Sequence, residues 1–159
     1  MIFVVLGTQD IPFTRLLKKL DRLITDGKIK EQVIVQSGFT KYSKNNMKVF
    51  DFLSPEEMDS YYDKAKFIIS HGGTGSLMKG IKKRKKIIAV PRLAKYNEHK
   101  DDHQLEIVRL FAEKKYLLAI ENIDELDKAL EDIETFEPEI YISKKDVIIK
   151  TIEQFIDAL

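Results

Sequence analysis

Short runs of apolar, mostly β-branched residues alternate along the chain with longer stretches in which apolar residues recur every three or four positions. The short runs predict β-strands at residues 2–6, 32–36, 47–50, 67–70, 87–90 and 117–120. They are almost continuously apolar, which a parallel sheet with helices on both faces requires. The pattern therefore predicts six strands in one mainly parallel sheet.

The longer stretches predict amphipathic helices with recognisable ends. Residues 14–25 place leucines and an isoleucine on one face, and Gly27 follows as a stop signal. A Ser-Pro-Glu-Glu sequence starts a second helix at residues 54–64, because Ser caps the first turn and Pro favours the first helical position. Further helices are expected at residues 99–113 and beyond the capping residue Asn122. Strands and helices that alternate in this way predict a doubly wound, Rossmann-like α/β fold.

Ligands of doubly wound sheets bind beyond the carboxyl ends of the strands, where the strand order reverses. In a sheet of six strands, this point lies between the first and the fourth strand. Gly7 and Thr8 follow the first predicted strand, and the sequence His-Gly-Gly-Thr-Gly-Ser follows the fourth. We therefore expect a ligand site that is built from these two loops.

The loop after the fourth strand has the composition of an anion-binding turn. It consists of His71, Gly72, Gly73, Thr74, Gly75 and Ser76. Glycines let backbone N–H groups approach a phosphate or diphosphate, while the hydroxyls and the start of the next helix favour negative charge. Two simpler interpretations stay open: the glycines make only a tight turn, and His71 is a turn residue rather than a phosphate donor. The chain lacks both the P-loop and the dinucleotide fingerprint, which argues against a P-loop hydrolase and a dehydrogenase.

A second polar cluster follows the fifth predicted strand. Glu98 and Gln104 carry a carboxylate and an amide, groups that pair well with the hydroxyls of a sugar. His99 and His103 lie four residues apart at the start of a predicted helix, and with Asp102 they are a candidate metal site. No third ligand is spaced to complete that set, and the acidic residues have an alternative role as partners of the helix dipole.

Composition limits the class of protein. At 159 residues and 18.5 kDa, the chain is expected to form one domain. Its net charge of +1 gives no reason to expect nucleic acid as a partner. The absence of cysteine excludes a disulfide scaffold, a Cys-ligated zinc site and a thiol nucleophile. No apolar run is long enough to cross a membrane and the amino terminus lacks a signal-peptide pattern, so we expect a soluble intracellular protein.

Two further segments depart from the average composition. Lys79 and residues 82–86 form the densest basic segment, which is either a solvated connection or a contact for an anionic membrane surface. The carboxyl-terminal segment, residues 143–159, is expected to be a helix that is too apolar for one buried face of a small domain. We therefore expect it to dock on a partner chain.

Several motifs taken together resemble a known family. The opening FVVLGTQDIPFTRLL, the QSG at 36–38, ISHGGTGS at 69–76 and VPR followed by EHKDDHQ are similar to the carboxyl-terminal half of MurG-like glycosyltransferases nearly end to end. Among these, the chain resembles most the stand-alone catalytic subunits of the PssE and EpsF type in bacterial exopolysaccharide or capsule synthesis. The resemblance implies a GT-B carboxyl-terminal half-domain over residues 1–159.

The resemblance also implies a reaction and its partners. Such a subunit binds a UDP-sugar as substrate and transfers a hexose, with galactose as one candidate, to a polyprenyl-diphosphate-linked saccharide with inversion. It needs neither a cofactor nor a metal. A separate membrane-anchored subunit supplies the acceptor half and recruits the cytoplasmic chain to the inner face of the membrane. A nucleotide-sugar-binding regulatory or scaffold subunit without catalysis is the alternative.

Site residues are carried over by position. The donor-binding residues implied by the resemblance are Gly7, Thr8, Gln36, Gly38, His71, Gly72, Gly73, Thr74, Gly75, Ser76, Arg92, His103 and Gln104. Glu98 and His99 are sugar or acceptor contacts and the candidates for catalysis, although the catalytic base itself is not identified. Related enzymes bind ribose through a Glu on the helix after the glycine loop, where this chain has Lys79. The way in which ribose is held is therefore an open question.

Overall fold

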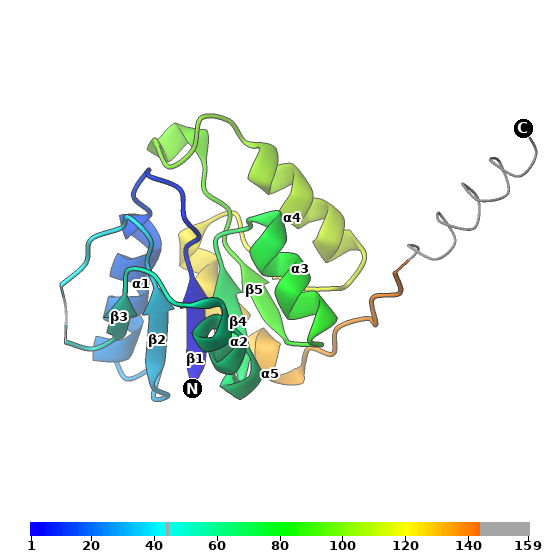
Figure 1. Ribbon diagram of the computed structural model, residues 1–159, viewed down its shortest axis with the longest axis horizontal. Helices are drawn as coiled ribbons and strands as arrows, with labels where there is room; N and C mark the ends of the chain where they lie inside the picture. Colours follow the sequence, from blue (N-terminus) through cyan, green and yellow to red (C-terminus); the bar gives the residue numbers. More distant parts are fainter. Residues whose placement is uncertain (44, 144–159) are drawn as a thin grey trace, which may run out of the picture.

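The computed structural model describes residues 1–43 and 45–143 and contains one six-stranded parallel sheet (Figure 1). The strands are β1 (Ile2–Val5), β2 (Val33–Gln36), β3 (Lys48–Phe50), β4 (Phe67–Ser70), β5 (Ile87–Ala89) and β6 (Leu118–Ala119). Their order is β3-β2-β1-β4-β5-β6, and every neighbouring pair is parallel. The predicted α/β Rossmann-like fold is confirmed. Five predicted runs are one or two residues longer than the strands.

The described part of the chain contains five α-helices, of which four connect strands and the fifth follows β6. They are α1 (Thr14–Thr25), α2 (Pro55–Lys64), α3 (Thr74–Lys82), α4 (His103–Glu113) and α5 (Leu126–Thr135), with 3-10 turns at Ala94–Tyr96 and Ile123–Glu125. The expected capping box of α2 is present, since Ser54 Oγ accepts from the Glu57 N–H and the Glu57 carboxylate accepts from the Ser54 N–H. Asn122 caps the 3-10 turn that precedes α5, with its side chain accepting from the Asp124 N–H.

The prediction that the fourth helix begins at His99 is wrong, because α4 begins at His103. Asn97 adopts a left-handed conformation with φ of 54° and ends the preceding 3-10 turn. The next residue, Glu98, is buried, and its carboxylate is held by partners outside any helix. Residues 99–102 are therefore part of a loop.

Helices cover both faces of the sheet and form two separate cores. Ile2, Val4 and Leu6 pack on the face that α1 and α5 cover. Phe3 and Val5 point to the opposite face, where α2, α3 and α4 pack, and Figure 1 shows α2 and α3 in front of the sheet. Because successive residues of a strand point to opposite faces, each strand needs apolar side chains at every position. This explains the continuous apolar runs in the sequence.

The topology brings the exits of β1 and β4 side by side at the carboxyl edge of the sheet. Val5 pairs in register with Ser70, and the His71 N–H donates to the Val5 carbonyl oxygen at 3.0 Å. The loop that begins at Gly7 and the loop of residues 71–76 therefore leave the sheet from adjacent positions.

The expected carboxyl-terminal helix lies outside the described residues, apart from its first residue, Ser143. The segment before it runs along the sheet edge, where the Glu139 N–H donates to the Lys115 carbonyl oxygen at 2.9 Å and Tyr141 packs edge-on against Tyr116. Among the described residues, the structure contains no helix with the length and apolar character needed to cross a membrane.

Candidate functional site

A cavity of about 390 Å³ opens at the carboxyl edge of the sheet, between the exits of β1 and β4. We call it the edge cavity. It is lined by Val5, Gly7, Thr8, Gln36, Phe52, Leu53, Met58, His71, Gly73, Thr74, Gly75 and Ser76. Eight of these residues belong to the set that the sequence nominates for donor binding. The cavity lies at the point of the fold where doubly wound sheets bind their ligands.

One end of the edge cavity is formed by the first turn of α3. Gly73 is the N-cap residue and offers no side chain to the free N–H groups, and the first turn contains no acidic residue. The N–H groups of this turn and the helix dipole therefore favour an anion, and the hydroxyls of Thr74 and Ser76 add further donors. The Tyr62 hydroxyl donates to the Ser76 carbonyl oxygen at 3.0 Å and fixes the turn to α2.

His71 forms the wall between the two glycine loops. Its Nδ1 lies 3.0 Å from the Val5 carbonyl oxygen, so Nδ1 carries the proton in the neutral ring and Nε2 carries the lone pair. The residue is only 7% exposed, and burial lowers the pKa of the imidazole to about 4. The ring is therefore neutral at pH 7.

Two glycines are required by the position of this ring. A Cβ atom on Gly7 would lie 2.6 Å from His71 Nε2, and one on Gly73 would lie 2.3 Å from it. Gly7 also has a φ of +75°, which side chains rarely adopt. The two loops approach each other closely only because neither position carries a side chain.

Gln36 supports the Gly7 loop from the other side. Its Nε2 donates to the carbonyl oxygens of Gly7 at 3.0 Å and Asp51 at 3.1 Å, so both amide hydrogens have partners. Gly38 packs behind this contact, where a Cβ would lie 2.4 Å from the Gly7 carbonyl oxygen. Gly72 faces α4, with Val108 Cγ2 at 2.9 Å from a Cβ placed there. These two glycines shape the loops without lining the edge cavity.

The sequence analysis missed the apolar wall of the edge cavity. Phe52 and Leu53 follow β3, and Met58 lies on α2. Phe52 is 52% exposed, and its ring packs edge-on against Phe39 with centroids 5.3 Å apart. The available signal was the position of Phe52 directly after a strand that ends at the same sheet edge.

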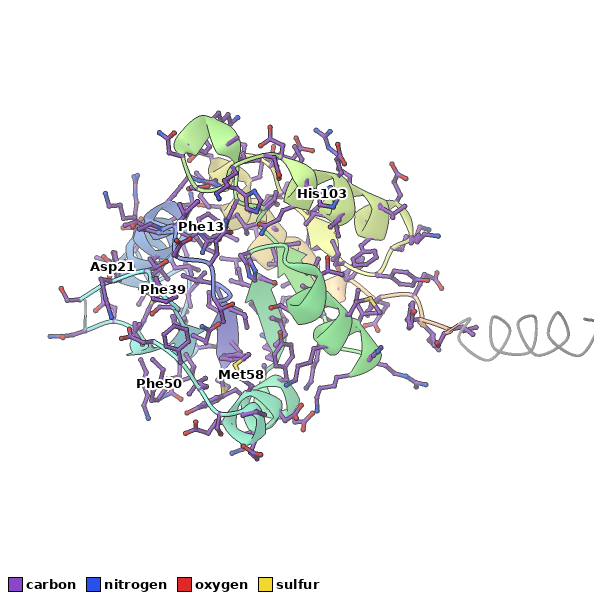
Figure 2. All side chains as sticks on the ribbon, turned by 45° about the horizontal axis from the view of Figure 1, so that its top comes forward. Phe13, Asp21, Phe39, Phe50, Met58 and His103 are labelled. Atoms are coloured by element: carbon purple, nitrogen blue, oxygen red, sulfur yellow. The ribbon has the colours of Figure 1, made fainter. Side chains whose placement is uncertain are left out.

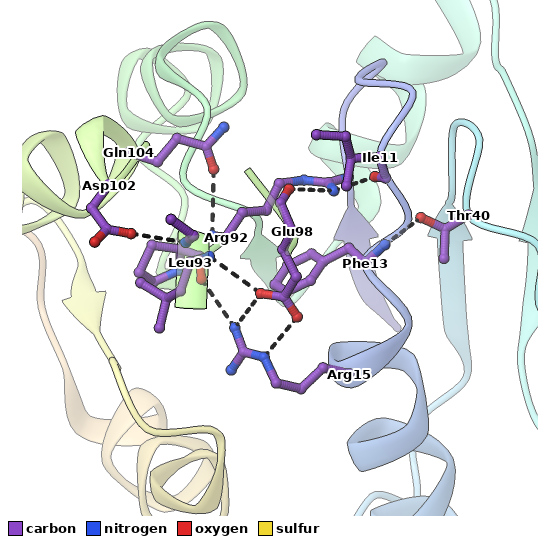
Figure 3. A network of polar contacts seen from close by, with 11 residues as sticks. Ile11, Phe13, Arg15, Thr40, Arg92, Leu93, Glu98, Asp102 and Gln104 are labelled. Atoms are coloured by element: carbon purple, nitrogen blue, oxygen red, sulfur yellow. Dashed lines mark hydrogen bonds and ion pairs between the residues drawn. The ribbon is translucent and has the colours of Figure 1, made fainter. Parts of the chain in front are cut away.

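Arg92 and Glu98 are engaged with the protein instead of lining the edge cavity (Figure 3). The Arg92 side chain is fully buried and donates to the carbonyl oxygens of Leu6, Ile11 and Glu98. Burial lowers the pKa of this guanidinium to about 10, so it stays charged at pH 7. Both carboxylate oxygens of Glu98 accept from Arg15 at 2.8 Å, and one also accepts from the Leu93 N–H.

The two candidate histidines of the second cluster do not share a helix, because His99 lies in the loop before α4. Its Nδ1 accepts from the Asp101 N–H at 3.2 Å. The His103 side chain is 69% exposed, and Figure 2 shows it on the α4 side, away from Phe39 and Met58. Gln104 accepts through Oε1 from the Arg92 N–H at 3.4 Å. None of the three lines the edge cavity.

The candidate metal site is not assembled either. The Asp102 carboxylate accepts from the Ala94 N–H at 2.9 Å. Within residues 1–43 and 45–143, no group of three or more His, Asp or Glu side chains is placed to hold a metal ion. The structure therefore offers no support for the metal interpretation of His99, His103 and Asp102.

The basic segment is largely engaged in ion pairs with neighbouring acidic residues. Lys79 and Lys83 contact Asp59 on α2 at 3.2 and 3.3 Å, and Lys83 also contacts Asp63 at 2.7 Å. Lys86 contacts Glu137 at 3.1 Å. The amine of Lys79 is thus directed toward α2, and this residue does not line the edge cavity.

Comparisons with known proteins agree with the fold. The Glycosyltransferase family 28 C-terminal domain matches the chain over residues 1–159. No curated protein sequence matches the chain.

Solved structures match at low sequence identity. The solution structure of ALG13 is 22% identical with a TM-score of 0.58, and the match covers 89% of each chain. The UDP-GlcNAc 2-epimerase of Methanocaldococcus jannaschii, solved with UDP-GlcNAc and UDP, is 14% identical with a TM-score of 0.64. MurG of Acinetobacter baumannii is 13% identical with a TM-score of 0.57.

The chain spans only part of most of these structures. The matches cover 97% of this chain but 45% of the epimerase, and 95% of this chain but 49% of MurG. Two further glycosyltransferases match over 35% and 33% of their own length. At these identities the structural likeness shows the fold, whereas the family match covers the whole chain.

Proposed function

Because the chain belongs to the family of glycosyltransferase family 28 C-terminal domains, we propose that it is the donor-binding catalytic subunit of a two-component glycosyltransferase. It moves a hexose, with galactose as one candidate, from a UDP-sugar to a polyprenyl-diphosphate-linked saccharide in exopolysaccharide or capsule synthesis. The observation that carries the proposal is the edge cavity, which combines an uncapped helix start with an apolar wall.

The two ends of the edge cavity match the two parts of UDP. The first turn of α3 and the Gly7 loop suit the diphosphate, because they offer N–H groups and hydroxyls without a competing carboxylate. Phe52, Leu53 and Met58 suit the flat, apolar faces of the uracil ring. Since the exit of β1 lies between those of β3 and β4, one ligand of this length touches all three loops.

The same geometry supports catalysis of group transfer. As the bond between the anomeric carbon and the diphosphate breaks, negative charge grows on the UDP leaving group, and the α3 N–H groups are placed to stabilise it. A diphosphate oxygen beside His71 Nε2 favours the protonated ring, so binding raises the pKa of His71 above its value of about 4. The proposed reaction needs no cofactor and no metal.

The general base is proposed to come from the partner subunit. Among the described residues, no carboxylate lines the edge cavity, and His71 is the only titratable residue that does. Both oxygens of the candidate Glu98 are occupied by Arg15. A membrane-anchored, acceptor-binding subunit would complete the cleft and hold this chain at the inner face of the membrane.

The first experiment measures the affinity of the chain for UDP by titration calorimetry. A Gly73→Val substitution drives a side chain into the His71 ring, and we expect it to weaken UDP binding by more than about 100-fold. Gly27→Val is the matched control, since a Cβ placed on Gly27 meets no atom within 4 Å and Gly27 does not line the edge cavity. The Gly27 variant should lose stability from its φ of +71° and keep its affinity for UDP. Equal affinities in wild type and Gly73→Val would remove the diphosphate assignment.

The second experiment separates a catalytic subunit from the non-catalytic alternative. The absence of a carboxylate in the edge cavity is the observation that favours a nucleotide-sugar-binding regulatory or scaffold subunit. Radiolabelled UDP-sugars are incubated with the chain and membranes that contain or lack the neighbouring membrane subunit. The proposal expects transfer to lipid only when both subunits are present. Binding without transfer in the complete system would establish the alternative.

A further inference from the structure

The two ends of one short loop are held by a single buried side chain. Arg92 Nη2 donates to the carbonyl oxygen of Leu6 at 3.0 Å, and Nη1 donates to that of Ile11. Leu6 is the last residue before Gly7, and Ile11, which Figure 3 shows bonded to Arg92, lies three residues after Thr8. The forked guanidinium therefore spans the loop of residues 7–10, which supplies Gly7 and Thr8 to the edge cavity.

Arg92 is itself held firmly by the loop after β5. Nη1 also donates to the Glu98 carbonyl oxygen at 3.3 Å, and the Arg92 N–H donates to Gln104 Oε1. The Glu98 carboxylate in turn binds Arg15 through two contacts of 2.8 Å. The arginine and its anchors thus join the exit of β1 to the exit of β5 and the start of α4.

The remaining sides of the Gly7 loop are fixed as well. Gln36 Nε2 donates to the Gly7 carbonyl oxygen, and the His71 ring fills the space where a Gly7 side chain would lie. At the far end of the loop, the Phe13 N–H donates to Thr40 Oγ1 at 2.9 Å. Arg92 is the one charged group among these supports, and it is the only one that contacts both ends of the loop in the described structure.

We propose that Arg92 is a positioning residue, which sets the place of Gly7 and Thr8 at the diphosphate end of the edge cavity. The inference deepens the proposed function and rests on it. It differs from the role that the sequence resemblance implies, because Arg92 reaches the donor only through the loop that it holds. Its consequence is specificity: Arg92 contributes to binding of UDP and leaves binding of unphosphorylated uridine unchanged.

A purely structural role would not need this residue. Burying a guanidinium is costly, and a well-packed apolar side chain often serves stability equally well. The forked N–H groups of arginine reach two separate carbonyl oxygens at once, whereas the ammonium of lysine acts as a single point charge on a shorter reach. Arg92→Lys therefore keeps the charge and removes the two-ended contact.

The test compares UDP with uridine as ligands of wild type, Arg92→Lys and Arg15→Lys. We expect Arg92→Lys to weaken UDP binding by about tenfold or more and to change uridine binding by less than about twofold. Arg15→Lys is the matched control, because it alters the same ion cluster and touches neither end of the Gly7 loop. Its ratio of UDP to uridine affinity should equal that of wild type.

Amide hydrogen exchange without ligand supplies the second measurement. Arg92→Lys should accelerate exchange in residues 7–11 while the amides of β1, β4 and β5 keep wild-type protection. Equal losses of UDP and uridine affinity, or an unchanged affinity for UDP, would overturn the inference and leave the proposed function standing. Absence of UDP binding by the wild-type chain would instead overturn the proposed function.

Discussion

Two polar regions at the carboxyl edge of the sheet use their side chains in opposite ways. The edge cavity is built mainly from glycine backbone and helix N–H groups, which are left without side-chain partners in the described structure. The loop after β5, residues 90–102, also contains polar groups, yet Arg92 and Glu98 form hydrogen bonds with other parts of the protein. One region offers its polar groups to a ligand, and the other holds the walls in place.

The difference shows why polar residues beyond a strand do not by themselves mark a ligand site. In the sequence, the three histidines all follow the fourth or fifth strand and look alike. In the structure, only His71 reaches the edge cavity, because it leaves the sheet beside β1 at the point where the strand order reverses. The position of a strand in the sheet therefore matters more than the type of residue that follows it.

The largest effect on UDP affinity is expected from Gly7→Ala. This substitution tests whether the edge cavity depends on backbone groups that only glycine leaves accessible. In Gly7→Ala, the Cβ lies 2.6 Å from His71 Nε2, so the loop or the ring must move. We expect UDP affinity to fall by more than about 100-fold. Gly27→Ala is the matched control, with a similar φ of +71° and open space around it. Calorimetric UDP titrations of both variants measure the difference.

A double substitution identifies why Gly7→Ala lowers the stability of the protein. His71→Ala removes the ring that the new methyl group meets. If the clash is responsible, the loss of stability in Gly7→Ala with His71→Ala is smaller than the sum of the two single losses. Additive losses would assign the effect to the backbone conformation of Gly7 alone. Thermal unfolding of the four proteins completes the cycle.

The next effect should appear in the loop after β5 and in stability rather than in ligand binding. Glu98→Ala leaves Arg15 without its carboxylate partner in a mostly buried place, which costs about 3 kcal/mol of unfolding free energy. UDP affinity should stay within about twofold of wild type. Urea unfolding and UDP titration measure the two quantities. If Glu98→Ala keeps its stability but loses transfer, Glu98 acts in catalysis, and the two regions do not differ in the way described above.

Much of the fold was predictable because burial on both faces of the sheet imposes continuous apolar runs. The placement of the first strand beside the fourth followed from the alternation of strands and helices and is confirmed by the sheet topology. The ligand site at the carboxyl ends of these two strands stays a prediction. The glycines at 7 and 73 were also informative, since the His71 ring occupies the space that a side chain would need at either position.

The role of the second cluster was not predictable from sequence, for a physical reason. Glu98 and Arg15 are 83 positions apart, so their pairing depends on how α1 packs beside the loop after β5. The same partner holds the carboxylate of the buried Glu98, and α4 begins only at His103. Phe52 escaped notice because an aromatic residue after a strand looks like core until the sheet edge is known.

A pH dependence of stability is expected from the buried ring of His71. Its pKa is lowered to about 4 in the folded chain, against an ordinary value near 6.5. Between these values the unfolded chain binds a proton that the folded chain refuses, so stability falls as the pH drops from 6.5 to 4. The full loss is up to about 3 kcal/mol. Urea unfolding across this range measures it, and His71→Gln should remove this part of the slope.

The pH dependence of UDP binding tests whether the diphosphate lies beside His71. If a diphosphate lies beside Nε2, the pKa of His71 rises in the complex, so UDP binds more tightly as the pH falls from 7 toward 5. Phosphate groups also titrate near pH 6, so His71→Gln is the reference that subtracts their contribution. The same pH dependence in both proteins would place the diphosphate away from the ring.

The smallest effect on UDP binding is expected at Gln104, where the two regions meet. Its Oε1 accepts from the Arg92 N–H at a long 3.4 Å, while its Nε2 has no protein partner within the described residues. Gln104→Leu should cost at most about 0.5 kcal/mol of stability, since a weak bond to a neutral group is lost. UDP affinity should stay within about twofold of wild type, because Gln104 does not line the edge cavity. If the Gln104 amide recognises the donor sugar, Gln104→Leu would instead raise KM for the UDP-sugar while leaving UDP affinity unchanged. Measuring the affinity for UDP and the KM for the UDP-sugar in parallel therefore decides whether Gln104 supports only the loop or also binds the sugar. A fall in UDP affinity would contradict both roles.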